Sequence, residues 1–313
     1  MIAFVLSGGG NRGGLEVGAM WTLTECGIRP QMVVGTSAGA LNAAAVATDP
    51  TLAGVQRLAN TWLETTRQDV YPGNALRMAL RFLIRRDGLF SNRRFHRFVQ
   101  AHVRPKARTF ADVRGARLYI TAVDLDTGVL HVFGDDPGDS VVDAIMASTA
   151  LLPYFPPWPY RGRRYIDGGV AACLPLSVAL ERGATEIYAM DLTYAGHPRR
   201  SIHGVIPILF QTANIMVHQL RQRDLAEARR RLGARLHYIP MPVYKDLSPF
   251  DFHHTAELIE EGRRQTEAYL EARERSAWLE GGAENESLAA ARGRLSAGLH
   301  LIRLHRRAAG ARH

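Results

Sequence analysis

The chain opens with short apolar runs that alternate with longer helical segments. Residues 2–6 and 31–35 are largely apolar and end at glycine or just before it, which is typical of strands buried on both faces of a parallel sheet. Residues 15–26 place apolar side chains along one helical face, and residues 38–47 are mostly alanine. This strand–helix–strand–helix order predicts an α/β domain with a central, mostly parallel sheet.

The downstream pattern continues this arrangement. We predict a basic helical block over 51–105, strands over 117–124, 129–133, 164–166, 186–190 and 236–239, and helices over 141–150, 175–182, 205–232 and 255–275. Four prolines between 153 and 159 predict a rigid, extended loop before the strand at 164–166. We expect one compact domain over residues 1–275, followed over residues 276–313 by a linker and a basic amphipathic tail.

A glycine-rich loop follows the first predicted strand and precedes the first helix. Glycine lets the backbone approach a ligand closely, and the free N–H groups at a helix start can face developing negative charge. We therefore predict an oxyanion hole built from Gly8, Gly9, Gly10, Arg12 and Gly13. Arg12 either donates a hydrogen bond to the anion or holds the loop in place.

The same loop also matches the dinucleotide-binding pattern G-x-G-x-x-G. That interpretation requires an acidic residue about 20 residues further on, at the end of the next strand. The next strand instead ends in Gly35-Thr36-Ser37. A nicotinamide-dependent dehydrogenase is therefore a distant alternative, and no cofactor is expected.

A nucleophile elbow is predicted where the second strand turns into a helix. Gly35, Ser37 and Gly39 form the pattern G-x-S-x-G, in which a sharp turn holds the serine hydroxyl out and the glycines avoid a clash. The simpler interpretation is that Ser37 only caps the following helix. The position between strand and helix favours the nucleophile.

A serine nucleophile requires a general base within hydrogen-bonding reach. Asp167, followed by Gly168 and Gly169 at the end of a predicted strand, is the candidate base. Asp-Gly-Gly alone is more often a turn, so the prediction depends on the other two motifs. None of the downstream histidines has a distinguishing sequence context, and no metal-ligand spacing is visible.

Taken together, these motifs make the chain resemble the patatin-like phospholipases, especially the compact bacterial members, over roughly residues 1–275. The segments that carry the resemblance are the loop at 8–13, the elbow at 35–39, Asp-Gly-Gly at 167–169, Ala147-Ser148, Leu174-Pro175-Leu176 and residues 248–252. One departure is that the family often has asparagine shortly after Asp-Gly-Gly, where this chain has Ala171-Ala172-Cys173.

The resemblance implies a three-layer α/β fold with the nucleophile elbow after the second strand. It further implies a catalytic dyad of Ser37 and Asp167, an oxyanion hole best placed at Gly9 and Gly10, and no cofactor or metal. The expected activity is hydrolysis of carboxylic esters in phospholipids or lysophospholipids through an acyl-serine intermediate. An acyltransferase using the same acyl-enzyme and a non-catalytic lipid-sensing protein are the alternatives.

Charge indicates what kind of partner the chain prefers. Lys and Arg total 39 against 30 Asp and Glu, a formal net charge of +9, and almost all of the basic residues are arginine. This balance favours anionic partners such as phospholipid headgroups, although an arginine-rich solvated surface explains it equally well. We expect a lipid ester substrate and no nucleic-acid partner, and the oligomeric state stays open.

The remaining features concern location. Cys26 and Cys173 cannot form a disulfide framework, and no apolar run reaches the length of a spanning helix or a signal sequence. We expect a cytoplasmic protein. In the tail, apolar residues from Leu288 to Ile302 recur at helical spacing among arginines, which predicts peripheral contact with an anionic membrane. A helix docked on its own domain or on a partner, and a disordered terminus, are the alternatives.

Overall fold

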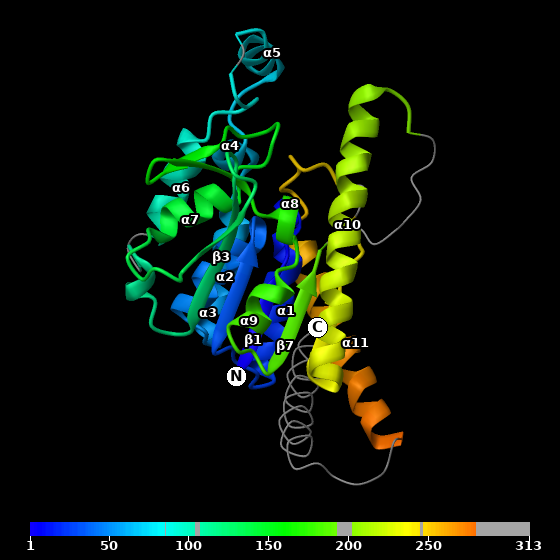
Figure 1. Cartoon of the computed structure of the whole chain (residues 1–313). Helices are drawn as coiled ribbons and strands as arrows, with labels where there is room; N and C mark the ends of the chain where they lie inside the picture. The colour runs from blue at the N-terminus through cyan, green and yellow to red at the C-terminus, as the bar shows by residue number, and fades with distance from the viewer. Residues whose placement is uncertain (85, 104–106, 193–201, 245–246, 280–313) are drawn as a thin grey trace, which may run out of the picture.

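The computed structural model describes residues 1–84, 86–103, 107–192, 202–244 and 247–279 (Figure 1). Its centre is an eight-stranded sheet in the order β5-β6-β3-β2-β1-β7-β8, with β4 paired to β3. Five neighbouring strands, β3, β2, β1, β7 and β8, are parallel to one another. By contrast, β4, β5 and β6 are antiparallel to the strands they pair with. The strands are β1 Ile2–Leu6, β2 Met32–Thr36, β3 Arg117–Asp124, β4 Leu130–Phe133, β5 Trp158–Tyr160, β6 Arg163–Asp167, β7 Glu186–Asp191 and β8 Leu236–Pro240.

Helices cover both faces of the sheet. One face packs against α1 Gly13–Glu25, α2 Ala38–Thr48, α3 Leu52–Glu64, α6 Arg93–Val103, α7 Val141–Ser148 and α11 Thr255–Leu279. The other face packs against α9 Leu176–Glu181 and the C-terminal half of α10 Val205–Leu232. Three short helices complete the described chain: α4 Arg67–Val70, α5 Ala75–Leu83 and α8 Gly169–Ala172. The predicted α/β fold with a central, mostly parallel sheet is confirmed.

The environment of strand β1 explains why its sequence is apolar at every position rather than at alternate positions. Phe4 and Leu6 point into the core under α1 and α2, and Ala3 and Val5 point into the core under α9 and α10. All four side chains are fully buried. A strand with helices on both sides has no polar face, which is the arrangement that the apolar run predicts.

The last described helix is part of the domain through a very close contact. A Cβ added at Gly18 in α1 would lie 1.9 Å from the carbonyl oxygen of Ile259, and one added at Gly262 in α11 would lie 2.0 Å from that of Leu15. Two glycines therefore let the backbones of α1 and α11 touch. This contact holds the N-terminal half of α1, which directly follows the glycine loop.

Several element predictions need correction. The proline-rich segment was expected to be a loop only, but Trp158–Tyr160 forms the edge strand β5. Helix α8 directly after Asp167 was not expected, and α11 continues to Leu279, beyond the predicted end at 275. Residues 280–313 of the predicted tail lie outside the described residues. Within the described part of the chain, no helix is both long enough and apolar enough to cross a membrane.

Candidate active site

Ser37 sits on a strained turn between β2 and α2. Its φ of 56° and ψ of −119° lie where residues with a side chain seldom occur. A Cβ at Gly35 would lie 2.2 Å from the carbonyl oxygen of Gly39, and one at Gly39 would lie 2.5 Å from that of Leu6. The two glycines therefore allow the backbone to fold tightly enough to present the Ser37 hydroxyl at the sheet edge.

Ser148 fixes this turn from the far end of α7. Its buried hydroxyl oxygen accepts a hydrogen bond of 2.8 Å from the Ser37 amide. From the sequence, Ser148 is noted only as part of the Ala147-Ser148 pair, and no role is predicted for it. Because the two serines are 111 residues apart, only the folded chain shows that one positions the other.

Asp167 ends β6 and is held beside Ser37 by backbone contacts. The Gly169 amide donates to Asp167 Oδ1 at 2.7 Å, and the Asp167 amide donates to the Ala150 carbonyl at 3.2 Å. A Cβ at Gly168 would lie 2.5 Å from the carbonyl oxygen of Thr121, so this glycine lets the loop lie against β3. The predicted serine and aspartate are therefore brought together by a turn that needs both glycines.

Burial controls the charge of Asp167. The residue is only 3% exposed, and desolvation raises the pKa of its carboxyl to about 6. Hydrogen bonds from the Ser37 side chain and the Gly169 amide lower the pKa and keep it from rising further. A carboxyl group with this pKa is ionised near neutral pH, yet far more basic than an exposed aspartate.

The glycine loop passes directly beside Ser37. A Cβ at Gly8 would lie 3.4 Å from Ser37 Cβ, and the Gly8 amide already donates to the Cys173 carbonyl at 2.9 Å. Gly8 therefore brings the loop close to the serine rather than offering a free N–H. Among the described residues, the amides of Gly9 and Gly10 have no acceptor. Gly10 has a φ of +62°, a conformation that favours glycine.

Arg12 and Gly13 hold the loop instead of facing the serine. Arg12 is buried, and its guanidinium donates to the Leu192 carbonyl at 2.5 Å, which supports the second of its two predicted roles. A Cβ at Gly13 would lie 2.5 Å from the Trp62 ring, so glycine is needed for α1 to approach α3. Both residues fix the position of Gly9 and Gly10.

A buried polar chain supports the loop from below. Trp62 Nε1 donates to Asn42 Oδ1 at 2.7 Å, and Asn42 Nδ2 donates to Glu16 Oε2 at 2.9 Å. Glu16 is fully buried, and desolvation raises its pKa well above the ordinary value. These side chains join α1, α2 and α3 beneath the glycine loop. Sequence periodicity gave no signal for them.

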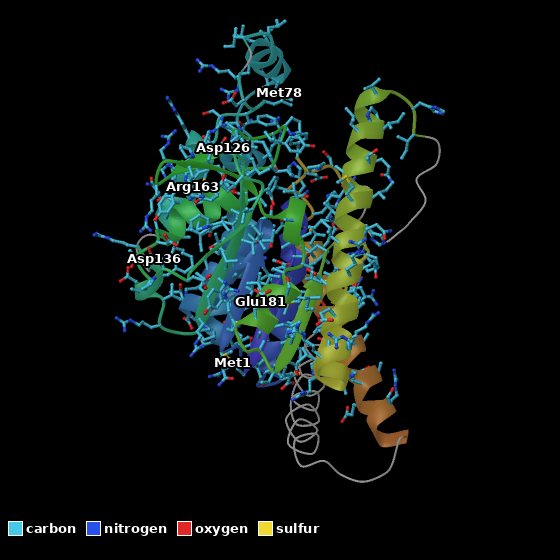
Figure 2. The ribbon with its side chains drawn as sticks, in the orientation of Figure 1. Met1, Met78, Asp126, Asp136, Arg163 and Glu181 are labelled. Carbon is cyan, nitrogen blue, oxygen red and sulfur yellow. The ribbon has the colours of Figure 1, made fainter. Side chains whose placement is uncertain are left out.

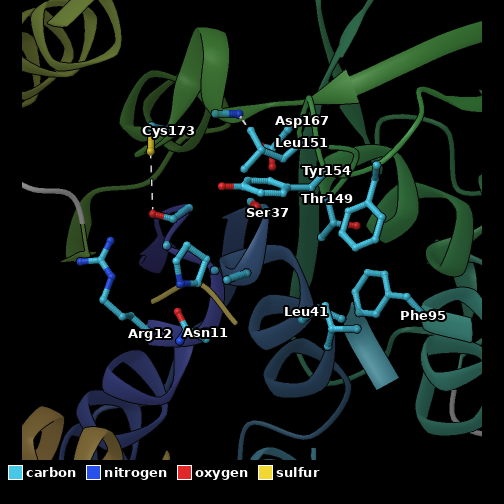
Figure 3. A pocket seen from close by; sticks show the side chains of 18 of the residues that line it. Asn11, Arg12, Ser37, Leu41, Phe95, Thr149, Leu151, Tyr154, Asp167 and Cys173 are labelled. Carbon is cyan, nitrogen blue, oxygen red and sulfur yellow. Dashed lines mark hydrogen bonds between the residues drawn. The ribbon is translucent and has the colours of Figure 1, made fainter. Parts of the chain in front are cut away.

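Ser37 and Asp167 lie at the floor of a cavity of about 1490 Å³ (Figure 3). One side is apolar and is lined by Leu41, Phe95 and Val99, with Tyr154 above them. Aromatic rings continue this wall: Tyr71 stacks on Phe155 at 5.3 Å between ring centroids, and Phe155 stacks on Phe95 at 5.8 Å. The apolar side offers room and surface for a long hydrocarbon chain.

Another part of the wall comes from α10, where polar side chains lie among the apolar Pro207, Ile215 and Val217. Gln211, Asn214, His218 and Arg221 line the cavity from this helix. Arg221 forms a fully buried ion pair with Asp191, which also accepts a hydrogen bond of 2.7 Å from the Tyr238 hydroxyl. The guanidinium contacts His218 Nδ1 at 2.7 Å. This network anchors α10 to β7 and β8.

Throughout the described ranges, no group of three or more histidine, cysteine, aspartate or glutamate side chains is placed to hold a metal ion. The hydrogen bonds to the Asp167 carboxylate within these ranges come from Ser37 and Gly169. The Ser37 hydroxyl, the buried Asp167 carboxyl and the amides of Gly9 and Gly10 thus line one cavity that has a large apolar side.

Comparison with known proteins assigns the family. The family model for patatin-like phospholipase matches residues 4–180, so the chain belongs to the patatin-like phospholipase family. Patatin-like phospholipase domain-containing protein 6 of mouse is 26% identical over 242 residues, which cover 74% of this chain but only 17% of that protein.

Two further similarities extend over more of the chain. The uncharacterized protein YqhO of Bacillus subtilis is 26% identical over 289 residues, covering 85% of this chain and 97% of that protein. The crystal structure of VipD from Legionella pneumophila aligns with a TM-score of 0.46 at 15% identity, over 86% of this chain and 66% of that chain.

Proposed function

We propose that this protein is a serine hydrolase of lipid carboxylic esters, acting on phospholipids or lysophospholipids through an acyl-serine intermediate. The observation that carries the proposal is the buried Asp167, with its pKa raised to about 6, hydrogen-bonded to Ser37 on the strained elbow. Membership of the patatin-like phospholipase family supports lipid hydrolysis in general.

The reaction begins with proton transfer from the Ser37 hydroxyl to the Asp167 carboxylate. The serine oxygen attacks the acyl carbonyl carbon, and the carbonyl π electrons move onto oxygen as the tetrahedral intermediate forms. Collapse of this intermediate breaks the ester bond, and the proton passes from Asp167 to the leaving alkoxide. Water, deprotonated by Asp167, then attacks the acyl carbonyl carbon, and the bond to the Ser37 oxygen breaks. The proton returns from Asp167 to this oxygen, which releases the fatty acid and regenerates both residues.

The amides of Gly9 and Gly10 are the proposed donors to the tetrahedral oxyanion. They line the same cavity as Ser37, they follow Gly8, which lies close to Ser37, and among the residues described they have no acceptor. Because the polar chain under the loop and the bond from Arg12 hold these amides in place, little reorganisation is needed as charge develops.

The two unlike walls of the cavity support a lipid as the substrate. Leu41, Phe95 and Phe155 form the apolar side, which suits the acyl chain, and Gln211 and Asn214 form part of the polar side, which suits a headgroup or glycerol. A short water-soluble ester would fill only the region next to Ser37. The proposed substrates are therefore long-chain, amphiphilic esters.

The direct test is labelling by a fluorophosphonate, which phosphonylates an activated serine. We expect one label on Ser37, loss of labelling and of fatty-acid release in Ser37→Ala, and wild-type behaviour of Ser91→Ala, a serine outside the cavity. Loss of the nucleophile should lower the rate by several orders of magnitude. Labelling or fatty-acid release that persists in a pure, folded Ser37→Ala preparation would contradict the proposal.

A further inference from the structure

The N-terminal half of α10 keeps an apolar face in solvent. Its cavity side carries Gln211, Asn214 and His218, at the spacing of one helical face, together with Pro207, Ile215 and Val217. Its opposite side is apolar and solvent-exposed, with exposed fractions from 40% to 74%. These outward residues are Val205, Ile208, Leu209, Met216 and Leu220.

The C-terminal half of the same helix has the ordinary orientation. Leu225, Ala228 and Leu232 are buried and pack with β7 and β8. The helix therefore meets its own domain with apolar residues at one end and presents apolar residues to the outside at the other. An apolar helix face left in water is unfavourable, so the outward face implies an occupant.

A second exposed apolar face lies on α5. Leu76, Leu80, Leu83 and Ile84 recur at helical spacing and are 54% to 78% exposed. Figure 1 shows α5 and the N-terminal end of α10 projecting from the same end of the molecule, and Figure 2 labels Met78 of α5 at its tip. The two helices with exposed apolar residues thus lie at the same end of the molecule.

The cavity reaches the surface at exposed apolar residues. Leu151, Leu152 and Val170 line the cavity and are themselves 40% to 45% exposed. They form an apolar rim at its mouth, and residues of α10 line the same cavity. We name the exposed apolar residues of α5, of the N-terminal half of α10 and of this mouth the docking face.

Charge indicates what the docking face meets. Residues 70–111, which contain α5 and α6, hold nine arginines and one lysine against the single acid Asp87. Residues 192–223, which contain the outward half of α10, have no acidic residue. Apolar helix faces among arginines suit the boundary between anionic headgroups and acyl chains.

We propose that the docking face lies on an anionic lipid surface, with α5 and the N-terminal half of α10 inserted on either side of the cavity mouth. A lipid then moves from the bilayer into the cavity over a continuous apolar path and reaches Ser37. This inference rests on the proposed function, because it assigns a lipid as the molecule that enters.

The test is sedimentation of the full-length chain with vesicles of phosphatidylcholine, alone or with phosphatidylglycerol. Two variants probe the face: Leu80→Glu/Leu83→Glu on α5 and Leu209→Glu/Met216→Glu on α10. Each should lower the affinity for phosphatidylglycerol-containing vesicles by about tenfold or more, since carboxylates would enter the apolar boundary. The control Leu63→Glu/Val129→Glu changes two residues of similar exposure elsewhere and should bind as wild type.

Activity separates this proposal from the proposed function. The docking-face variants should hydrolyse a soluble short-chain ester at the wild-type rate and lose rate only on vesicles. Ser37→Ala should bind vesicles normally and hydrolyse neither substrate. If wild type hydrolyses no ester but binds vesicles through this face, the proposed function fails and the docking face stands.

Three outcomes would overturn the docking face. The first is vesicle binding by both face variants equal to that of the control. The second is conversion of a dimer to a monomer by the α10 variant with vesicle binding unchanged, which would make the face an interface between copies. The third is loss of binding only in a full-length variant with Arg303, Arg306 and Arg307 changed to glutamine, which would assign the anchor to the C-terminal tail.

Discussion

The ionisation of Asp167 links the fold to the proposed chemistry. Because its pKa is about 6 in the folded chain and 3.8 in the reference state, the folded protein binds more protons between these values. The free energy of unfolding therefore falls as pH rises through this window, and at neutral pH the buried charge costs about 3 kcal/mol. The raised basicity of Asp167 therefore comes with a lower free energy of unfolding at neutral pH.

The same pKa predicts the pH dependence of hydrolysis. The rate constant kcat/KM for a soluble ester should fall about tenfold per pH unit below about 6, because only the ionised Asp167 accepts the serine proton. Asp167→Asn should be as inactive as Ser37→Ala. Asp126→Asn, which removes an exposed carboxyl paired with Arg164, should leave the profile unchanged. A profile that stays flat to about pH 4 would show that Asp167 is not the base.

At the scale of elements, helix α11 is in close backbone contact with α1, the helix that follows the glycine loop. Gly262→Ala would place a Cβ 2.0 Å from the Leu15 carbonyl oxygen, so the two helices must separate. We expect the free energy of unfolding to fall by roughly 1–3 kcal/mol, measured by chemical denaturation. Gly138→Ala, at an exposed loop glycine, is the matched control and should change it little. Equal stability of the two variants would contradict the close contact.

Sequence pattern predicted the elements that are long enough to show a continuous apolar run or a helical repeat. The strand at 2–6 is buried on both faces, and the helix predicted at 205–232 occupies those residues. Short elements such as β5 and α8 were missed, because three or four residues carry no periodicity. Their existence depends on pairing with β6 and on the backbone geometry after Asp167.

The same distinction holds for the candidate site. The positions of Ser37 and Asp167 could be inferred because the turns that hold them require glycine at fixed neighbouring positions. Ser148 and Leu192 could not be assigned roles, because they act through hydrogen bonds to residues more than a hundred positions away. Contacts of that kind leave no local signal in a chain.

For the whole molecule, charge and apolar surface act together at the docking face. Raising the salt concentration from about 0.05 M to about 0.5 M should weaken sedimentation with phosphatidylglycerol-containing vesicles, because screening reduces attraction between arginines and headgroups. Binding to vesicles of phosphatidylcholine alone should change little, since salt does not screen the burial of apolar side chains. Equal salt effects on both vesicles would show that headgroup charge has no part in the interaction.

The long helix α10 also bears on selectivity. Its C-terminal half is fixed by the buried pair of Arg221 and Asp191 and by Leu225, while its N-terminal half forms one wall of the cavity without being packed into the core. A cavity whose wall is fixed at only one end changes its width to fit the molecule that it binds. For the proposed hydrolase, this arrangement predicts selection for the shape of the ester next to Ser37 and tolerance of many chain lengths beyond it. Membranes of varied fatty-acid composition would then serve equally well as substrates.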